Sequence, residues 1–553
     1  MILKGSSIVM ECLKEEGTEI IFGYPGGGIM PLYDALYDYR DSVKHILTAH
    51  EQGATHAADG YARSTGKVGV CFATSGPGAT NTVTGIATAY MDSVPMVVIT
   101  GQVPIPMIGK DSFQEVDILG VTLPVTKHNI FCRAVEDIPA AIHKAFQIAR
   151  SGRPGPVLVD IPKNLFQAST DYKATGKLSV YQGAKADDKD IDFIADAINN
   201  AKSPVIIAGG GIIISESSEL LNKLAKKANI PVATTMMCLG AFDRRDELSV
   251  GMVGMHGEKE ANQAVANSDL ILALGTRFSD RVVGDVKKFA SKAKIIHVDI
   301  DKAEIDKNVT TDFHVIGDCR KVLEGLIPKV YNNDNREWIE KVNGWRKQVK
   351  TSTNLKPRTL FNTVAEVLGD DCIVCTDVGQ HQMWTAQRWP FNRPRTFISS
   401  GGLGTMGFGL GAAIGAKLGN EDKTVVLFSG DGSFRMNLNE LATVSANNLK
   451  IIVIVIKNNT LGMVRQWQKI FFDKRYSQTD LEDVIDYESL AKGFGLYGCY
   501  VKKLEDFREE IIKAKNSDKA SVIACEISVD ANVLPMVPPG GAIADQLISI
   551  ETK

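Results

Sequence analysis

The sequence predicts an α/β protein made of three consecutive domains, each with a parallel sheet flanked by helices. Short runs of valine and isoleucine alternate with helical patterns from end to end. Such continuous apolar strands are buried on both faces, which is typical of parallel sheets covered by helices. A chain of 553 residues has room for about three to four domains. Strands are expected at 68–73, 96–100, 157–161, 205–208, 270–274, 295–300, 373–376, 425–429 and 451–456.

Two polar stretches break the alternation and predict the domain boundaries. Residues 168–190 are rich in Lys, Asp, Ser and Thr, and residues 330–356 are polar and charged. Both stretches are interpreted as linkers. The predicted domains are therefore an N-terminal domain over 1–170, a central domain over 188–330 and a C-terminal domain over 357–553.

Composition excludes several classes of function. The chain is 44% hydrophobic and 23% charged with a net charge of −3, so a core of normal size is available. It has no Lys/Arg-rich run that would favour nucleic-acid binding. No stretch approaches the roughly 18 consecutive apolar residues of a membrane span. The N-terminus begins directly with an amphipathic helical pattern, so we expect no signal or transit segment.

Cysteine usage indicates a reduced cytoplasm. The nine cysteines are scattered, and only Cys372 and Cys375 form a Cys-x-x-Cys pair. That pair lies inside an apolar run expected to be a buried strand, so it is interpreted as two free core thiols. No second pair completes a zinc site. We therefore predict a cytoplasmic protein without disulfides.

The most informative stretch lies near the C-terminal end. An apolar strand ends at Gly430-Asp431-Gly432, a helical segment follows, and the next apolar run closes at Asn458. Glycines let the backbone approach a ligand closely, and a helix start offers N–H groups to a diphosphate. Carboxylate, amide and phosphate oxygens suit Mg²⁺. The stretch predicts a Mg²⁺-diphosphate clamp between neighbouring parallel strands, since a hairpin with a loop Asn pair leaves the helical segment unexplained.

A second pattern lies in the N-terminal domain. A strand over 20–23 ends in Tyr24-Pro25-Gly26-Gly27-Gly28. Glu51 then begins a helix with small residues at 54, 57, 58 and 62, which indicate close packing against another element. Taken alone, Glu51 could simply be a favourable charge at a helix N-terminus. The glycine turn around Gly78 follows the next strand.

Together these patterns resemble thiamine diphosphate enzymes, which carry Gly-Asp-Gly followed by Asn-Asn. In that family a buried glutamate hydrogen-bonds the aminopyrimidine ring and promotes loss of the C2 proton. The resemblance assigns this role to Glu51. It also implies that Met406, inside the glycine cluster 401–409, wedges between the two cofactor rings; Met406 as plain core filler is the alternative. The implied architecture is a thiamine diphosphate-binding fold at both ends and a Rossmann-like middle domain.

Longer segments resemble one family, the acetohydroxyacid synthase (acetolactate synthase) catalytic subunits, over essentially the whole chain. The matching segments are 49–54, 109–115, 151–157, 277–281 and 461–468. The resemblance implies that pyruvate loses CO₂ on the cofactor and that the hydroxyethyl carbanion attacks pyruvate or 2-ketobutyrate. The products would be 2-acetolactate or 2-aceto-2-hydroxybutyrate, on the route to valine, leucine and isoleucine.

The resemblance also implies roles for individual residues. Catalytic or channel positions are Glu51, Gln114 and Lys163, and Mg²⁺ would be held by Asp431, Asn458 and Thr460. Substrate contacts would be Phe113, Arg277 and Trp467, with Arg277 meeting the second ketoacid's carboxylate and Trp467 its extra methyl. A surface salt bridge and a core aromatic are the plain alternatives for Arg277 and Trp467. Thiamine diphosphate contacts would be Pro25, Gly26, Gly78, Gln380, His381, Gly404, Met406, Gly430, Gly432, Ser433, Gly462 and Met463.

The central domain resembles the family's FAD-binding domain. A glycine run follows one strand, and acidic residues close another. The chain reads Arg-Phe-Ser-Asp-Arg, with Ser279 where biosynthetic members carry Asp. A catabolic, FAD-independent acetolactate synthase therefore stays open as an alternative. The expected FAD contacts are Arg153, Gly209, Gly210, Gly211, His256, Gly275, Arg277, Asp299 and Asp318.

The resemblance also implies partner subunits, and rival functions remain to be compared with it. Cofactors enclosed between two subunits imply a homodimer or a dimer of dimers, and a small regulatory subunit is expected. The catabolic acetolactate synthase is the closest alternative. A pyruvate oxidase is a further rival, against which Gln114, Arg277 and the segment 461–468 argue. A non-catalytic relative should have lost Glu51, Asp431 or Asn458. The sequence does not determine the product ratio or the feedback amino acid.

Overall fold

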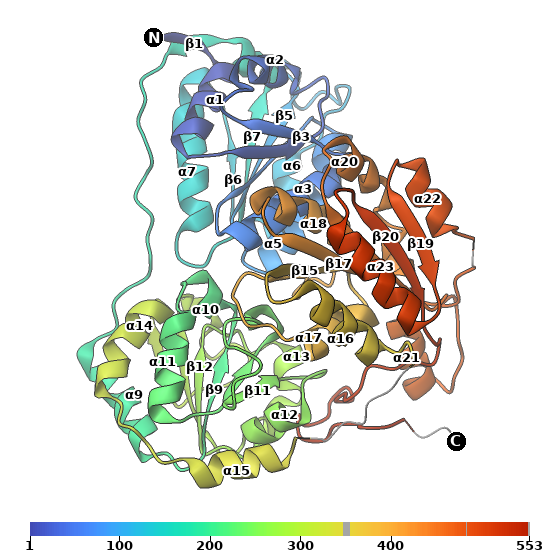
Figure 1. Cartoon of the computed structure of the whole chain (residues 1–553). Coiled ribbons are helices and arrows are strands. Elements are labelled where there is room, and N and C mark those ends of the chain that lie inside the picture. Colours follow the sequence, from blue (N-terminus) through green and yellow to red (C-terminus); the bar gives the residue numbers. More distant parts are fainter. Residues whose placement is uncertain (347–353, 483, 551–553) are drawn as a thin grey trace.

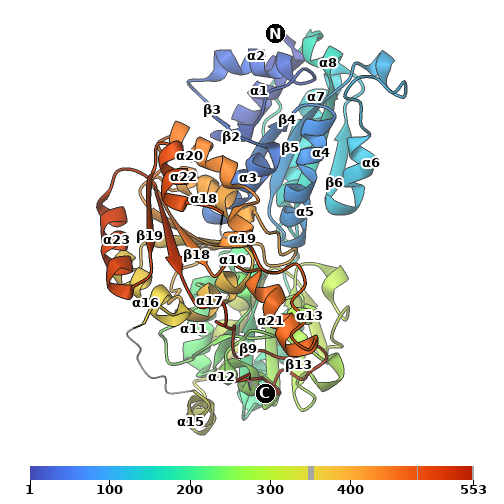
Figure 2. The ribbon, with the colours of Figure 1, turned by 90° about the vertical axis from the view of Figure 1, so that its right-hand side faces the viewer.

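The computed structural model describes residues 1–346, 354–482 and 484–550, which form three α/β units (Figure 1). The N-terminal unit lies at the top of Figure 1, the middle unit at the lower left and the C-terminal unit at the right. Figure 2 gives the view from the right-hand side. Of the expected boundaries, residues 347–353 of the second linker and residues 483 and 551–553 of the C-terminal domain lie outside the described residues.

The N-terminal unit is built on a six-stranded parallel sheet in the order β3-β2-β4-β5-β7-β6. Its strands are β2 (Ile20–Gly23), β3 (Lys44–Leu47), β4 (Gly69–Ala73), β5 (Met96–Gln102), β6 (His128–Phe131) and β7 (Pro156–Pro162). Its helices are α1 (Gly5–Glu15), α2 (Met30–Tyr39), α3 (Glu51–Thr65), α4 (Pro77–Asn81), α5 (Val83–Met91), α6 (Ile118–Thr122), α7 (Ile138–Arg150) and α8 (Lys163–Gln167).

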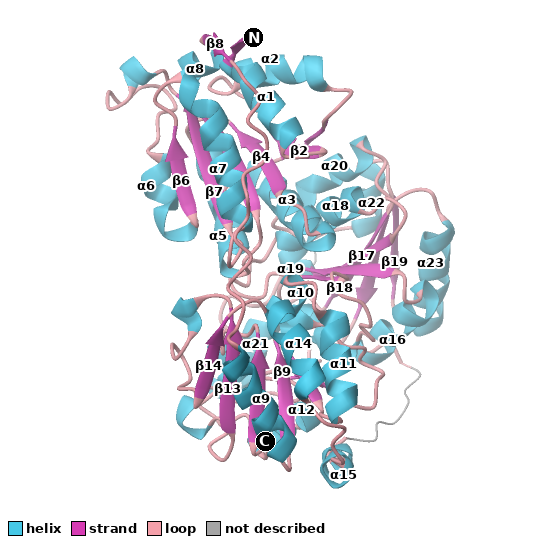
Figure 3. Ribbon diagram, turned by 90° about the vertical axis from the view of Figure 1, so that its left-hand side faces the viewer, coloured by secondary structure: helices cyan, strands magenta, loops and turns pink. Residues whose placement is uncertain are grey.

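The middle unit has a six-stranded parallel sheet in the order β11-β10-β9-β12-β13-β14, seen face-on in Figure 3. Numbered within the unit, this order is 3-2-1-4-5-6, the Rossmann order. The strands are β9 (Pro204–Ala208), β10 (Val232–Thr234), β11 (Ser249–Met252), β12 (Leu270–Leu274), β13 (Lys294–Asp299) and β14 (Phe313–Ile316). The helices are α9 (Asp188–Asn200), α10 (Gly210–Ile214), α11 (Ser218–Ala228), α12 (Lys259–Ala266), α13 (Asp280–Val283), α14 (Cys319–Leu326) and α15 (Arg336–Gly344).

The C-terminal unit has the strand order β16-β15-β17-β18-β20-β19, again all parallel. Counted within each unit, both terminal sheets read 2-1-3-4-6-5, so they share one topology. The strands are β15 (Cys372–Thr376), β16 (Phe397–Ile398), β17 (Thr424–Gly430), β18 (Ile451–Lys457), β19 (Tyr497–Val501) and β20 (Ser521–Glu526). The helices are α16 (Pro357–Leu368), α17 (Gln380–Arg388), α18 (Phe408–Gly419), α19 (Asp431–Phe434), α20 (Leu441–Ala446), α21 (Gly462–Phe471), α22 (Tyr487–Gly493) and α23 (Leu504–Asn516).

Both predicted linkers contain some regular structure. In the first, β8 (Ser169–Asp171) pairs antiparallel with β1 (Ile2–Lys4), and residues 172–187 then run without helix or strand down the outside of the molecule (Figure 1). In the second, α15 buries Trp338, whose indole N–H donates to the carbonyl of Pro204 at the start of β9. An indole with a partner packs well in a core, so this part of the polar stretch belongs to the middle unit.

The terminal units share one hydrophobic core. Helix α3 packs against α18, and a single buried cluster runs from the N-terminal sheet through both helices into the C-terminal sheet. The facing surfaces are glycine and alanine because the backbones touch. A Cβ at Gly60 would lie 2.1 Å from the carbonyl oxygen of Ala412, and one at Gly415 would lie 1.8 Å from that of Ala57. The small residues of α3 therefore mark close packing, as predicted.

The described residues also bear on the cysteines, on membrane spans and on metal-binding clusters. Cys372 and Cys375 are buried free thiols in β15, as expected. No described helix combines the length and apolar character needed to cross a bilayer. No cluster of three or more His, Cys, Asp or Glu side chains suited to a metal is found in the described ranges. A cation site built from one carboxylate and neutral oxygens remains compatible with that result.

The helix interface gives a stability prediction. Replacing Gly415 with Ala places a methyl against the backbone of α3, which cannot withdraw as a side chain could. We expect the melting temperature to fall by roughly 5 °C or more. Gly493→Ala in α22 is the matched control, because its Cβ meets nothing within 4 Å. Equal melting temperatures for both variants would contradict this account of the interface.

Candidate active site

The predicted clamp residues meet at the carboxyl ends of adjacent strands. Asp431 directly follows β17 and is 2% exposed. Its Oδ2 accepts the N–H of Asn459 at 2.7 Å, and its Oδ1 accepts that of Gly432 at 3.1 Å. Burial raises the pKa of Asp431, and these N–H bonds oppose the shift. Asn459 has a φ of 55°, a left-handed conformation that Asn tolerates, so the turn after β18 aims its N–H at Asp431.

Asn458 is the centre of a buried amide cluster. Its Nδ2 lies 3.3 Å from Oε1 of Gln380, at the start of α17, and its Oδ1 accepts the N–H of Thr460 at 3.3 Å. A Cβ at Gly462 would lie 2.1 Å from the same Gln380 oxygen. The structure therefore brings four predicted residues together, and Gln380 orients Asn458.

His381 leaves one polar atom free for a ligand. Its Nε2 is buried and has no hydrogen-bond partner among the described residues. Burial lowers the pKa of His381 to about 3, so the ring is neutral. Its ring faces Gly430, where a Cβ would lie 3.0 Å from Nδ1, and Ser433 Oγ accepts the Gly430 N–H at 3.2 Å. A buried unpaired ring nitrogen beside this glycine turn fits a phosphate oxygen.

The glycine cluster 401–409 is held from two sides by carboxylates that the sequence analysis missed. Asp377 accepts the N–H groups of Gly407 and Gly409, and burial raises its pKa to about 6 despite those bonds. Asp92, from the N-terminal unit, accepts the N–H groups of Gly401 and Gly402 at 2.9 and 2.7 Å. Between them the chain presents exposed Gly404 and half-buried Met406. An acidic residue directly after an apolar strand was the available signal for Asp377.

Glu51 forms a second centre in the N-terminal unit. It is 8% exposed, and its Oε2 accepts a hydrogen bond from Asn81 Nδ2 at 3.0 Å. A Cβ at Gly78 would lie 3.2 Å from its Oε1. Gly78 therefore leaves free space beside the carboxylate. A Cβ at Gly26 would likewise lie 2.5 Å from the Thr74 side chain, and Pro25 beside it is exposed.

The predicted channel residues have three different environments. The backbone of Gln114, with a φ of 60°, covers Gly76, whose Cβ would lie 2.8 Å from the Gln114 carbonyl oxygen. Phe113 is 87% exposed, an unusual state for a phenylalanine side chain. Lys163 begins α8 directly after β7 and is half-buried.

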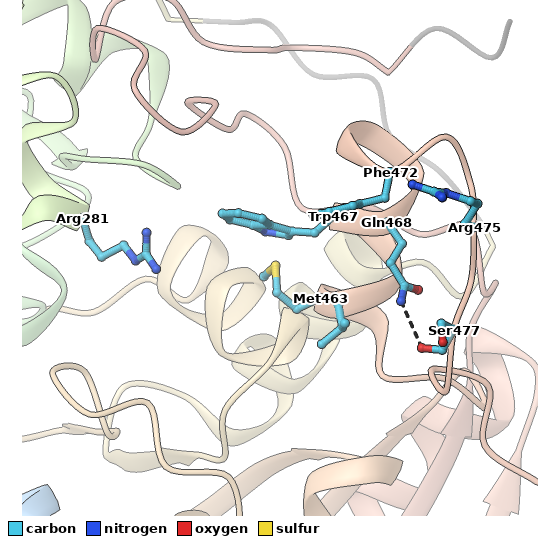
Figure 4. Close-up of a pocket in the computed structure, with 8 residues that line it drawn as sticks. Arg281, Met463, Trp467, Gln468, Phe472, Arg475 and Ser477 are labelled. Atoms are coloured by element: carbon cyan, nitrogen blue, oxygen red, sulfur yellow. Dashed lines mark hydrogen bonds between the residues drawn. The ribbon is translucent and has the colours of Figure 1, made fainter.

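A pocket of about 810 Å³ opens beside α21 (Figure 4). Its wall is mostly apolar, and two arginines reach it. Arg281 comes from α13 in the middle unit, whereas Arg277 does not line the pocket. The arginine that faces Trp467 is thus four residues later than the one chosen from the sequence. The lining residues are Arg281, Met463, Val464, Trp467, Gln468, Phe472, Arg475 and Ser477.

Arg277 has a different environment. It is half-buried after β12, its carbonyl oxygen accepts a hydrogen bond from Asn308 Nδ2 at 3.1 Å, and no described carboxylate forms an ion pair with it. The surface salt bridge considered as an alternative is therefore not found in the described part of the chain.

The glycines of the middle unit meet where its strand order reverses. β9 and β12 are neighbours, and a Cβ at Gly209 would lie 2.1 Å from the carbonyl oxygen of Gly275, which has a φ of 58°. Ligands of open α/β sheets bind at such switch points. Gly210 and Gly211 open α10, and Gly211 donates to the same Gly275 oxygen at 3.0 Å.

Of the other expected FAD contacts near the middle unit, His256 has a polar atom without a partner in the described part of the chain, and the rest already form hydrogen bonds or ion pairs within the protein. His256 Nδ1 is buried without a partner among the described residues, and burial lowers the pKa of His256 to about 4. Asp299 ends β13 and accepts the N–H of Asp301. Arg153 already pairs with Asp301 and Glu304, and Asp318 caps α14.

Comparisons with known proteins identify the class. Residues 3–121 match the N-terminal thiamine pyrophosphate-binding domain of thiamine pyrophosphate enzymes. Residues 191–326 match their central domain, and residues 377–525 match their C-terminal thiamine pyrophosphate-binding domain. The fold and the three matches together define a thiamine pyrophosphate (thiamine diphosphate) enzyme, and the expected fold class is confirmed.

Full-length relatives narrow the class. A probable acetolactate synthase large subunit of Methanocaldococcus jannaschii is 44% identical over 100% of this chain and 96% of its own length. The acetolactate synthase large subunit of Parasynechococcus marenigrum is 45% identical over 99% of this chain and 91% of its own length. That of Corynebacterium glutamicum is 45% identical over 98% of this chain and 90% of its own length. The chain belongs to the family of acetolactate synthase large subunits, which confirms the resemblance drawn from its sequence.

The clamp gives a binding prediction. Asp431→Asn removes the buried negative charge that a cation would share with diphosphate, so we expect the Kd of thiamine diphosphate in the presence of Mg²⁺ to rise roughly tenfold or more. Isothermal titration calorimetry measures this Kd. Asp486→Asn, at the exposed cap of α22, is the control and should bind as the wild type does. Unchanged affinity in Asp431→Asn would remove Asp431 from the clamp.

Proposed function

We propose that this protein catalyses the condensation of pyruvate with pyruvate or 2-ketobutyrate, giving 2-acetolactate or 2-aceto-2-hydroxybutyrate for branched-chain amino-acid biosynthesis. The observation that carries the proposal is that the residues of the clamp and those of the pocket are adjacent in the chain. Asn458 directly follows β18, and α21 begins at Gly462 and lines the pocket with Met463 and Trp467. A cofactor held at the clamp would therefore present its reacting end to a pocket suited to small ketoacids.

The residues present fit thiamine diphosphate and Mg²⁺. Asp431, the amide oxygen of Asn458 and the backbone carbonyl of Thr460 would hold the cation, and the free Nε2 of His381 suits a phosphate oxygen. Gly430, Gly432 and Ser433 would place backbone and hydroxyl groups around the diphosphate. When bound, thiamine diphosphate supplies a C2 carbon that takes up the electrons released by decarboxylation.

Glu51 would hold the proton that activates the cofactor. Its carboxyl is buried, Asn81 fixes one oxygen, and the other faces the space left by Gly78. A carboxyl so placed can donate to a ring nitrogen of the aminopyrimidine and favour the form that accepts the C2 proton. Met406, Gly404 and the exposed loop around them would contact the rings, and Gln114 would cover the site from the loop above Gly76.

Arg281 replaces Arg277 as the proposed contact to the second ketoacid's carboxylate. It reaches the pocket beside Trp467, and a guanidinium can bind a carboxylate with two parallel hydrogen bonds. The apolar wall around Met463 and Trp467 suits the ketoacid's alkyl group and excludes water. One methylene is worth only about 1–3 kcal/mol, so contact with Trp467 can set the preference for 2-ketobutyrate. Phe113 and Lys163 remain proposed channel residues.

FAD fits the middle unit in part. Gly209, Gly210, Gly211 and Gly275 lie at the topological switch point, and His256 Nδ1 is free for a ligand. Asp299 lies at the same carboxyl edge of the sheet. Arg153 and Asp318 are already engaged within the protein, so they would act by shaping the site. The proposed reaction needs no net redox step from a flavin.

We also propose a cytoplasmic homodimer, or a dimer of such dimers, with a small regulatory subunit. Exposed apolar side chains of the N-terminal unit, at Phe113 and Leu123, suit such an interface. The name "large subunit" given to the relatives supports a smaller partner. The free cysteines support a reducing compartment.

An activity assay tests the reaction. Protein supplied with pyruvate, thiamine diphosphate, Mg²⁺ and FAD should form acetolactate, scored as acetoin after acid treatment. Glu51→Gln should lower the rate at least about 100-fold, because it removes the acid that activates the cofactor. Glu19→Gln, an exposed carboxylate of the same unit, should not change the rate. Peroxide or reduced flavin in place of acetolactate would instead identify a pyruvate oxidase.

A second comparison decides between the two arginines. Arg281→Gln should raise the KM for pyruvate by roughly tenfold, since a charge-assisted bidentate contact is lost. Arg277→Gln should change this KM by less, because Arg277 lies outside the pocket. Steady-state kinetics on both variants measure the difference. A larger effect in Arg277→Gln would return the carboxylate contact to the arginine first chosen from the sequence.

A further inference from the structure

A buried carboxylate from the C-terminal unit holds the turn that carries Glu51. Glu440 ends the short 3₁₀ turn Leu438–Glu440 and is 0% exposed. Its Oε1 accepts the N–H of His50 at 3.0 Å, and its Oε2 accepts that of Ala49 at 3.2 Å. These two amides directly precede Glu51 in the chain. The contact crosses between the two terminal units of the same chain.

The hydrogen bonds leave this turn little freedom. His50 is the N-cap of α3, and its Nδ1 accepts the N–H of Gln52 at 3.0 Å. The N–H groups of Ala49 and His50 lie before the helix, and Glu440 accepts both. Thr443 Oγ1 donates to Glu440 Oε2 at 2.6 Å and fixes the carboxylate in turn. Two backbone amides and one hydroxyl thus share this carboxylate, which ties the turn before Glu51 to the C-terminal unit.

The sequence around Glu51 makes room for the contact. A Cβ at Gly53 would lie only 2.0 Å from Glu440 Oε1. Glycine at this position therefore lets the carboxylate of Glu440 reach the two amides. Gly53 is one of the small residues of α3, and its need for space comes from this side chain rather than from α18.

We propose that Glu440 is a positioning residue that holds Glu51 at the distance from the cofactor's pyrimidine ring at which proton transfer occurs. The inference rests on the proposed function. Glu440 has no direct contact with the reacting atoms in this assignment, and it acts through the backbone of Ala49 and His50. It lies on the segment that also carries Asp431, so one segment of the C-terminal unit supports both the cation clamp and the turn before Glu51.

The test measures deuterium exchange at C2 of bound thiamine diphosphate, by NMR after acid quench. Glu440→Gln replaces one acceptor oxygen with an NH₂ group that faces a backbone donor. We expect the C2 exchange rate to fall roughly tenfold, because small displacements of a catalytic group are costly. In the same variant without cofactor, amide exchange in a peptide spanning residues 48–53 should become faster. Glu16→Gln is the control, since Glu16 is equally buried but pairs with His143 and Arg150 on α7.

Gly53→Ala offers an independent check, because its methyl would displace the same carboxylate. It should slow C2 exchange to a similar extent, and Gly53→Ala combined with Glu440→Ala should lose no more than Glu440→Ala alone. Should Glu440→Gln not fold, Glu440→Asp, which withdraws the carboxylate by one methylene, is judged by the same rate.

The outcomes separate the two proposals. C2 exchange that is absent in the wild type would overturn the proposed function. Wild-type exchange in Glu440→Gln, with unchanged amide protection at residues 48–53, would overturn the positioning role alone.

Discussion

The contact between helices α3 and α18 joins the two terminal units. Their backbones approach so closely that glycine is needed on both sides, and a single hydrophobic core continues through them from one sheet into the other. Each of the two helices is joined directly to a candidate site segment. The helix contact therefore also sets the positions of these two segments relative to each other. Glu51 begins α3, and the glycine cluster 401–409 ends in α18. Asp92 and Glu440 then cross the interface in opposite directions and bind backbone N–H groups on the other side.

The same design recurs in the three sheets. In each sheet, candidate ligand-binding residues follow the strands at the switch point, where the strand order reverses. The connections from the two strands there diverge and leave a crevice. The glycines there allow backbone approach. Two of the buried polar atoms without a partner among the described residues, His381 Nε2 and His256 Nδ1, belong to segments that follow strands at these carboxyl edges. A buried nitrogen without a hydrogen bond is costly, so these two atoms indicate the kind of group each crevice is built to hold.

The choice between Arg277 and Arg281 shows how the chemistry depends on packing. Both belong to one short motif, and both could bind a carboxylate. In the structure the chain turns after β12 through Phe278, whose φ is 48°, and only the second arginine, on α13, reaches the wall formed by α21. The pocket thus combines side chains from two units. Arg281 comes from the middle unit, whereas Arg475 and the apolar wall come from the C-terminal one.

The sequence by itself determined the α/β class, the three units, most strand positions, and the local clusters around Glu51 and Asp431, because apolar runs, glycine turns and strand ends are local features. The linker expected at 330–356 was partly wrong, since this stretch contains α15, which buries Trp338 against the middle unit. Only the tertiary structure decided the strand orders, the pairing of α3 with α18, and the surroundings of Asp377, Asp92, Glu440 and Arg281. Each of these depends on contacts between residues distant in the chain, and neither spacing nor composition specifies which distant segments meet.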